Sequence, residues 1–143
     1  VVHLAGDRDV ETVRSAYATA GIPAVVLPFC DRMQEVYPAA DLAISRSGAA
    51  SLGELSWFGL PSVLVPFPYA AEDHQRLNAE IFTRAGAAKL LPEPEATGQI
   101  LSRLVISLLE SPETLATMAT AARALAPRDA AARVAAVLTG VKS

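Results

Sequence analysis

Short, uniformly apolar runs alternate with helical patterns along most of this chain, and that alternation constrains the fold more than any other feature. The runs read VVHL, AVVLPF, DLAIS, SVLVPF and AAKLL. Strands of about five residues that alternate with helices form βαβ units and a parallel sheet. Because the runs do not alternate apolar with polar residues, helices are expected on both faces of the sheet. The sequence therefore predicts an α/β fold with a doubly wound, mainly parallel sheet.

Helices are expected between these runs and after the last one. Residues 75–85 show the clearest helical spacing, with an apolar stripe made of Leu77, Ile81, Phe82 and Ala85. Further helices are expected over residues 9–20, with an acidic cap, and over 32–37 and 129–138. A helix after Gly48 should turn Leu52, Leu55, Ser56 and Gly59 toward the sheet, and a later one should have an apolar face of Ile100, Leu101, Leu104, Val105 and Leu108. Another helix should begin at Ser111-Pro112, with Ser111 as its cap.

Length, charge and cysteine content narrow the class of protein. The 143 residues are enough for one domain with a sizeable core, and we take 1–143 as that domain. A net charge of -3 argues against nucleic acid as a partner, because little would neutralise a run of phosphates. The single cysteine, Cys30, forms no internal disulfide and points to a cytoplasmic protein. Because the chain opens at Val1 inside an apolar run, we expect a fragment truncated at its N-terminal side.

The stretch RSGAASLGELSWFGLP, residues 46–61, places small residues before a lone carboxylate. Small side chains leave the backbone bare, so an anion could reach the N–H groups and the positive dipole end of a helix. Glu54 lies about 4.5 Å further along the axis than Ser51, at a rise of about 1.5 Å per residue. That offset suits a nucleoside diphosphate whose ribose hydroxyls meet the carboxylate. The alternative is an ordinary glutamate that complements the helix dipole.

The stretch AAEDHQRLNA gathers polar side chains at another helix start: Glu72, Asp73, His74, Gln75 and Asn78. His74 and Asn78 share a helix face at i, i+4. Polar, amide-rich clusters of this kind suit sugar hydroxyls. The alternative is a solvated helix start with Asp73 as its cap. A single nearby histidine without a cysteine ligand argues against a zinc site.

A shorter acidic motif, Asp7-Arg8-Asp9, follows the first apolar run. It superficially matches the Asp-x-Asp pair with which some glycosyltransferases hold a metal, but helix capping accounts for both acids more simply. The sequence contains no Gly-x-Gly-x-x-Gly, Walker or Gly-x-Ser-x-Gly pattern. The residues therefore predict neither a metal site nor a bound cofactor.

Taken as a set, these motifs resemble the C-terminal half of the MurG family. The resemblance rests on Arg-Ser-Gly-Ala followed by a glutamate, then Gly-Leu-Pro, Asp-His-Gln and Asn-Ala, all within residues 40–91. The segments VVHLAG, PFCDRM and the tail that begins at Ser111 fit the same family. Its members transfer N-acetylglucosamine from UDP-N-acetylglucosamine to the peptidoglycan precursor lipid I, which yields lipid II. Their GT-B fold has two Rossmann-like domains, and the resemblance implies the UDP-sugar donor-binding domain.

The resemblance also implies ligand contacts for individual residues. Phe29 and the backbone of Cys30 would lie against the uracil, and Glu54 would accept the ribose hydroxyls. The diphosphate would meet the turn formed by Ala49, Ala50 and Ser51, and Ser47 and Gly48 just before it would also belong to the nucleotide-binding residues. The sugar hydroxyls would be read by His74 and Gln75, with support from Asp73 and Asn78.

What the fragment lacks follows from the same resemblance. The acceptor-binding N-terminal domain, with the general base and the surface that docks on the membrane, would belong to the missing half, so this chain is expected to hold no catalytic residue. The parent would be an inverting, metal-independent transferase, peripheral on the cytoplasmic face of the cell membrane. The fragment alone would have little or no activity. Loss of the first βα unit would expose a sheet edge and favour self-association.

Two alternatives share these observations. Another GT-B sugar transferase, or a UDP-N-acetylglucosamine 2-epimerase, would have the same fold and nucleotide site. A non-catalytic subunit that binds a nucleotide sugar and works only with a partner chain, as in split transferases, would also fit the motifs.

Overall fold

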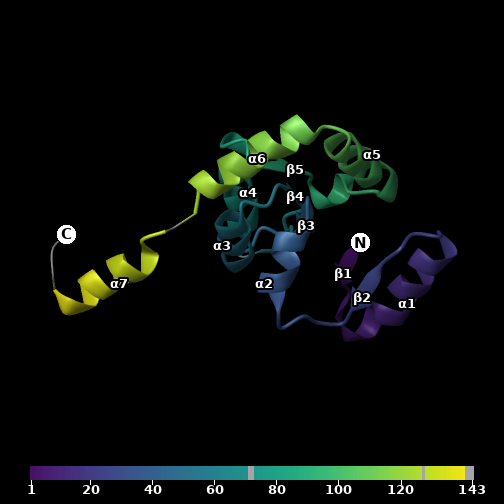
Figure 1. Cartoon of the computed structure of the whole chain (residues 1–143), viewed down its shortest axis with the longest axis horizontal. Helices are drawn as coiled ribbons and strands as arrows, with labels where there is room; N and C mark the ends of the chain where they lie inside the picture. Colours follow the sequence, from purple (N-terminus) through teal and green to yellow (C-terminus); the bar gives the residue numbers. More distant parts are fainter. Residues whose placement is uncertain (71–72, 127, 141–143) are drawn as a thin grey trace. The chain divides into compact units, whose positions relative to one another are not determined.

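The computed structural model describes residues 1–70, 73–126 and 128–140, and the chain divides into two compact units, Val1–Ala39 and Ala40–Ser143. Strands and helices alternate in both units, as the apolar runs predict (Figure 1). Every strand pair that the structure describes is parallel. The parallel α/β class is thus confirmed, and the described strands pair as two separate sheets.

The first unit is built on a two-stranded sheet with the order β1-β2. His3 in β1 lies opposite Val26 in β2, and the intervening helix α1 packs on β2. The elements are β1 (Val2–Leu4), α1 (Gly6–Thr19), β2 (Val25–Leu27), α2 (Met33–Val36) and the short 3-10 helix η1 (Tyr37–Ala39).

The start of α1 differs from its prediction. The helix begins at Gly6 instead of Asp9, because Gly6 takes a φ of +73° and turns the chain directly out of β1. Ala5 occupies the N-cap position without a side-chain hydrogen bond, so the expected acidic cap is wrong. Asp7 and Asp9 lie in the first turn, where they complement the positive end of the helix dipole.

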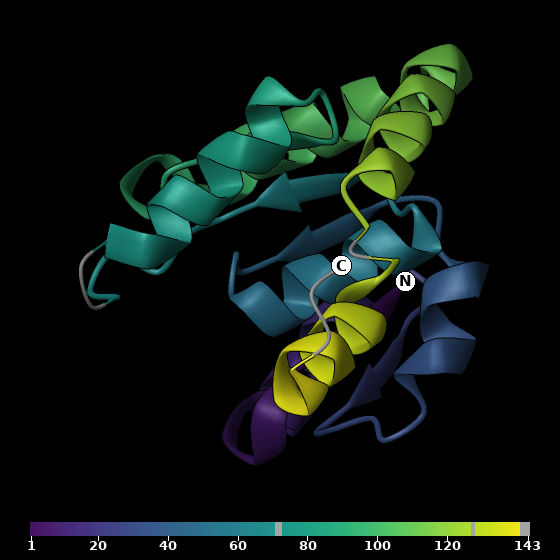
Figure 2. The ribbon, with the colours of Figure 1, turned by 90° about the vertical axis from the view of Figure 1, so that its left-hand side faces the viewer.

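The second unit is built on a three-stranded sheet with the order β3-β4-β5, in which Ile44, Val63 and Lys89 lie side by side. Figure 2 shows helices on both sides of these strands. The elements are β3 (Ala43–Ser45), α3 (Ala49–Phe58), β4 (Ser62–Leu64), α4 (His74–Arg84), β5 (Ala88–Leu90), the 3-10 helix η3 (Glu93–Glu95), α5 (Gly98–Leu109), α6 (Pro112–Ala124) and α7 (Ala130–Thr139).

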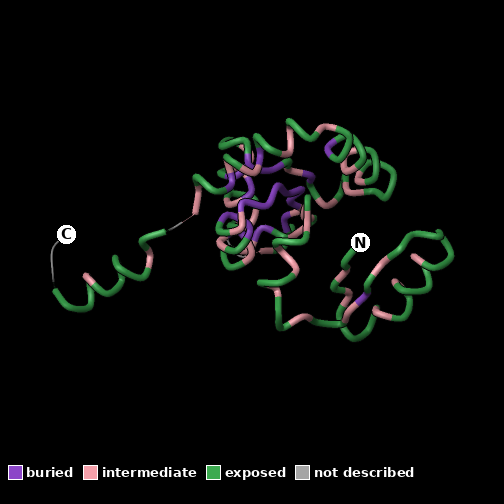
Figure 3. The backbone as a smooth tube through the Cα atoms, viewed as in Figure 1, coloured by how far each residue is buried: buried purple, intermediate pink, exposed green. Residues whose placement is uncertain are grey.

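The core of the second unit lies around the central strand β4, all of whose residues are buried (Figure 3). Val63 packs against Leu91, Leu108 of α5 and Met118 of α6. Such a strand, buried on both faces, explains why the run SVLVPF carries so few polar residues. Pro112 starts α6 as predicted, but Ser111 makes no side-chain cap to the backbone, because its hydroxyl lies 2.7 Å from that of Thr114.

Helix α3 follows its predicted orientation. Leu52, Leu55 and Ser56 are its buried residues, as their helical spacing indicates. The helix ends at Gly59, whose φ of +64° is the left-handed conformation that glycine adopts at little cost. A Cβ at Gly59 would lie 2.3 Å from Cγ of Arg123 on α6, so packing also favours a glycine there.

Two predicted apolar faces differ from the structure. On α4, Ala79 and Phe82 are buried, but Leu77 and Ile81 are 48% and 49% exposed. The inner side of α4 also takes two half-buried polar residues, Gln75 and Asn78. On α5 the buried position is Leu108, whereas Ile100, expected on the same face, is exposed.

Candidate functional site

The start of α3 presents bare backbone. Gly48 is the N-cap, in an extended conformation with φ -67° and ψ 148°, and the first turn is Ala49, Ala50 and Ser51. Any residue can adopt those angles, and a Cβ on Gly48 would meet nothing within 4 Å. The chain's own packing therefore does not require glycine there, whereas close approach of a ligand would. Ala49 and Ala50 are exposed, so their N–H groups lie at an accessible helix start.

Ser47 links this helix start to the next one. Its side chain is fully buried, and its hydroxyl donates to the backbone oxygen of Gln75 at 2.7 Å. The side-chain amide of Asn78 in turn donates to the backbone oxygen of Ser47 at 3.2 Å. These two hydrogen bonds hold the start of α3 against the start of α4. Ser47 therefore uses its hydroxyl for the fold, and a contact between Ser47 and a nucleotide stays a prediction.

Gln75 is fixed from two directions. Besides receiving the Ser47 hydroxyl on its backbone, it accepts a hydrogen bond from the Phe67 N–H on its side-chain oxygen, at 3.0 Å. The loop between β4 and α4 is thereby tied to the first turn of α4. His74 precedes Gln75 as the first residue of α4, and its side chain is exposed. The predicted sugar-reading residues thus come together at one helix start, close to the bare start of α3.

Asp73 does not cap α4 in the predicted way. It occupies the N-cap position in a left-handed conformation, φ 56°, but its side chain makes no capping hydrogen bond. Its carboxylate accepts a hydrogen bond from Arg76 and forms an ion pair with it. This hydrogen bond, together with the charge of Asp73, raises the pKa of Arg76. Glu72, which belongs to the same predicted cluster, lies outside the described residues.

Glu54 and Ser51 lie on α3 as the motif predicts. Glu54 is exposed and Ser51 half-buried. Phe29 and Cys30, the residues predicted to meet a base, follow β2 in the first unit. Phe29 is 76% exposed and Cys30 is half-buried, so an aromatic face is available beside a thiol in that unit.

One residue near the site was missed by sequence reasoning. The guanidinium of Arg46, directly before Ser47, lies over the ring of Phe67 at 5.5 Å and 2.8 Å from a carboxylate oxygen of Glu93. The hydrogen bond from Arg46 lowers the pKa of the Glu93 carboxyl. Arg46 belongs to the Arg-Ser-Gly-Ala motif, which is the signal that could have drawn attention to it.

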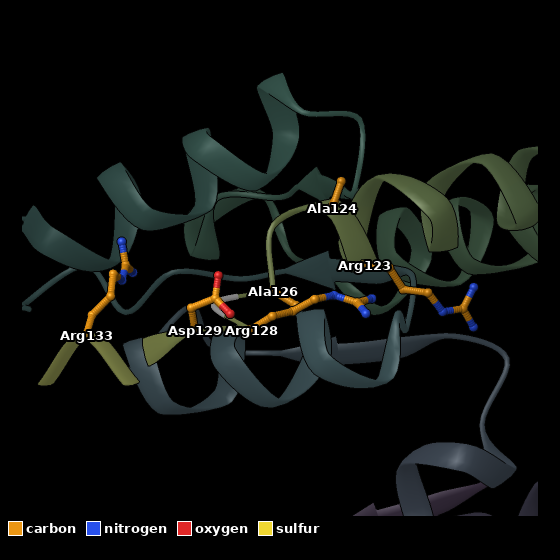
Figure 4. A pocket seen from close by; sticks show the side chains of 6 residues that line it. All are labelled: Arg123, Ala124, Ala126, Arg128, Asp129 and Arg133. Atoms are coloured by element: carbon orange, nitrogen blue, oxygen red, sulfur yellow. The ribbon is translucent and has the colours of Figure 1, made fainter. Parts of the chain in front are cut away.

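A separate hollow of about 520 Å³ opens where α6 meets α7 (Figure 4). Arg123, Arg128 and Arg133 line it together with Asp129 and two alanines. None of the predicted site residues lines it, and its shape is open, so the start of α3 stays the better candidate for a nucleotide. Within the described residues there is no acidic, histidine or cysteine group that could hold a metal ion. Nor does any described helix have the length and apolarity needed to cross a membrane.

Comparison with known proteins places this geometry in a family. Residues 1–134 match the family described as glycosyltransferase family 28 C-terminal domain. The chain is 47% identical to a protein of Nostoc punctiforme named UDP-N-acetylglucosamine--N-acetylmuramyl-(pentapeptide) pyrophosphoryl-undecaprenol N-acetylglucosamine transferase, over 94% of this chain. It is 50% identical to a protein of the same name from Chromohalobacter salexigens, again over 94% of this chain. The chain spans only 37% and 36% of the length of these two relatives.

Solved structures agree with the sequence relatives. The crystal structure of Acinetobacter baumannii MurG superposes with a TM-score of 0.90 at 34% identity, covering 97% of this chain and 42% of that one. A glycosyltransferase of kitacinnamycin has a TM-score of 0.62 at 22% identity, over 84% of this chain and 30% of that one, and this likeness shows the fold alone. The matched residues, the parallel sheets and the sequence relatives agree, and this chain belongs to the glycosyltransferase family 28 C-terminal domain family.

Proposed function

We propose that this chain is the donor-binding domain of an enzyme that transfers N-acetylglucosamine from UDP-N-acetylglucosamine to a lipid-linked acceptor. The observation that carries the proposal is the accessible start of α3 at Gly48, joined through Ser47 to the polar start of α4. One helix start suits phosphates and the other suits sugar hydroxyls. The relatives named above are N-acetylglucosamine transferases, which supports this choice of donor.

The diphosphate, the ribose and the sugar of the donor each have a proposed contact. The diphosphate meets the N–H groups of Ala49–Ser51, where the helix dipole favours negative charge. Glu54, about one turn further along α3, accepts the two ribose hydroxyls, which a carboxylate can do with both oxygens. His74 and Gln75 contact the sugar, with Asp73 and Asn78 in support.

The acceptor and the chemistry belong to the rest of the enzyme in this proposal. The names of the relatives give an N-acetylmuramyl-(pentapeptide) pyrophosphoryl-undecaprenol acceptor, and the chain spans 37% of that relative. We place the acceptor site, the general base and the membrane-docking surface in an N-terminal domain of the parent. The parent would then work as a peripheral protein on the cytoplasmic face of the membrane in peptidoglycan synthesis.

A self-association of the isolated chain is part of the proposal. β1 pairs only with β2 among the described strands, so its other edge offers unpaired backbone groups. Val1, Val2 and Leu4 are 65%, 50% and 42% exposed at that strand. Exposed apolar strand edges favour pairing with a second chain. We therefore expect dimers or larger assemblies at high protein concentration.

Substitution of Glu54 tests the proposed ribose contact. The two hydrogen bonds to this carboxylate are expected to contribute about 1.5–4 kcal/mol together, so Glu54→Ala should weaken UDP binding about 10- to 1000-fold. Ser51→Ala removes a neutral hydroxyl and should cost about 1 kcal/mol. The measurement is an NMR titration with UDP. The unsubstituted chain should bind with a dissociation constant above about 0.1 mM, because in this proposal the rest of the enzyme helps to close the site.

The matched control for this substitution is Glu95→Ala, which removes an exposed carboxylate in η3. That variant should bind UDP like the unsubstituted chain. Wild-type affinity in Glu54→Ala would show that Glu54 does not hold a ribose.

A further inference from the structure

Arg46 joins the ends of all three strands of the second sheet. It follows β3, and its NH1 group donates to the backbone oxygens of Val65 and Pro66, just after β4, at 3.1 and 3.3 Å. The same group donates to Oε2 of Glu93, in the short helix after β5, at 2.8 Å. A single guanidinium therefore holds the loop after β4 against the segment after β5.

The contacts of Arg46 continue into the start of α4. The guanidinium lies over the Phe67 ring, 5.5 Å from its centre. The N–H of Phe67 donates to the side-chain oxygen of Gln75 at 3.0 Å, and the hydroxyl of Ser47 donates to the backbone of Gln75 at 2.7 Å. Arg46 is thus connected to Gln75 in two ways: through its contact with Phe67, and through its sequence neighbour Ser47.

We propose that Arg46 is a positioning residue for the donor sugar. It fixes the loop at Val65–Phe67, and Phe67 in turn orients the side chain of Gln75 toward the sugar. This inference rests on the proposed function, in which Gln75 contacts the sugar. A binding residue that is held by a supporting layer loses less conformational freedom when it meets its ligand.

The chemistry of arginine suits this position better than that of lysine. A planar guanidinium can stack on an aromatic ring while its N–H groups point to several acceptors in a fixed pattern. All three acceptors are bonded by the NH1 nitrogen of Arg46, and a lysine ammonium could keep some of these contacts, but it has no planar face to stack on the Phe67 ring. Arg46→Lys therefore removes the stack on Phe67 and keeps the charge.

The exposure of the Arg46–Glu93 pair argues against a role for Arg46 that only stabilises the fold. The side chains of Arg46 and Glu93 are 46% and 39% exposed. Ion pairs at that exposure contribute little to folding, because water screens them and two long side chains must be ordered. The expected effect of losing Arg46 is therefore a misplaced loop, and with it a misplaced Gln75, more than a less stable domain.

The test compares two ligands on the same variants. UDP-N-acetylglucosamine should bind Arg46→Lys about 3- to 30-fold more weakly than it binds the unsubstituted chain, the range of energetic coupling through a network of contacts. The affinity for UDP, which lacks the sugar, should fall less than about 2-fold in Arg46→Lys. The matched control is Arg103→Lys on α5, an exposed arginine with no hydrogen bond or ion pair in the described chain. Equal loss for both ligands, or no loss for either, would overturn the proposal.

A measurement without ligand separates this proposal from the proposed function. Hydrogen exchange of the Phe67 amide, which donates to Gln75, should be about 5-fold faster or more in Arg46→Lys. Glu93→Gln, which leaves the two carbonyl contacts in place, should give a smaller change, and Glu95→Gln none. If the unsubstituted chain binds neither ligand, the proposed donor is wrong. In that case an unchanged Phe67 exchange rate would refute the positioning role as well. A faster Phe67 exchange rate would show that Arg46 fixes the loop but has no role in binding a sugar.

Discussion

The two units of this chain share one sequence pattern and differ in how much of it they bury. In residues 1–39, Val26 is the one buried apolar residue, and α1 buries none. In the described part of the second unit, residues 40–70, 73–126 and 128–140, every residue of β4 is buried, and a core forms with α5 and α6. A two-stranded sheet with one packed helix is marginal by itself, whereas three strands with helices form a core. Alternating apolar runs therefore specify strands in both units, but burial depends on how many layers surround them.

Truncation of matched leucines should show the largest difference between the units. Leu64 ends β4 and is fully buried, whereas Leu4 ends β1 and is 42% exposed. Leu64→Ala should lower the free energy of unfolding by about 2–5 kcal/mol, because it removes apolar contact and leaves a cavity. Leu4→Ala should cost less than about 1 kcal/mol. Urea denaturation followed by circular dichroism measures both, and equal losses would contradict the difference in burial.

A matched pair of glycines sharpens the comparison. Gly59 and Gly21 both end helices with positive φ, +64° and +66°. Alanine costs about 1–2 kcal/mol in that conformation at either position. At Gly59 the new methyl would also displace Arg123, whereas nothing lies within 4 Å at Gly21. Gly59→Ala should therefore lower the melting temperature further than Gly21→Ala.

The control for this pair is the same substitution in an Arg123→Ala background. Without the arginine side chain, Gly59→Ala should cost about as much as Gly21→Ala. If the gap between the two glycines persists in that background, the packing of Arg123 does not explain it.

A substitution on the exposed edge of the first unit should have the smallest effect on stability but a clear effect on self-association. Val2→Lys places a charge on the half-exposed β1 edge and should remove self-association, because charged edge strands resist pairing. Sedimentation at millimolar protein should give assemblies for the unsubstituted chain and monomer for Val2→Lys. Leu138→Lys, on the exposed face of α7, serves as the control. A strictly monomeric unsubstituted chain would contradict the proposed association.

Local patterns predicted the secondary structure but not the pairing across the fold. Apolar runs and helical spacing placed the strands and the buried side of α3 correctly. The apolar stripe of α4 was partly wrong, because Gln75 and Asn78 take the inner side, where backbone groups of Phe67 and Ser47 bond them. Periodicity counts apolar residues and carries no information about such distant partners.

In the candidate site, too, local features could be predicted and contacts between distant residues could not. The bare start of α3 could be predicted from small residues alone, since it depends on local backbone. The burial of Ser47 and the contacts of Arg46 could not, because their partners lie on other strands and helices, at Gln75 and Glu93. Motif residues that look like ligand contacts can instead hold the elements that carry them.

Chemical-shift mapping of UDP-N-acetylglucosamine binding tests the central claim most directly. The claim is that the joined starts of α3 and α4 hold the donor. Titration of the isotope-labelled chain should move the amide signals of residues 48–54 and 74–78 most. The signals of α5 and α6 should stay nearly still. Shifts confined to α5, α6 and α7, or no shift at millimolar ligand, would contradict the claim.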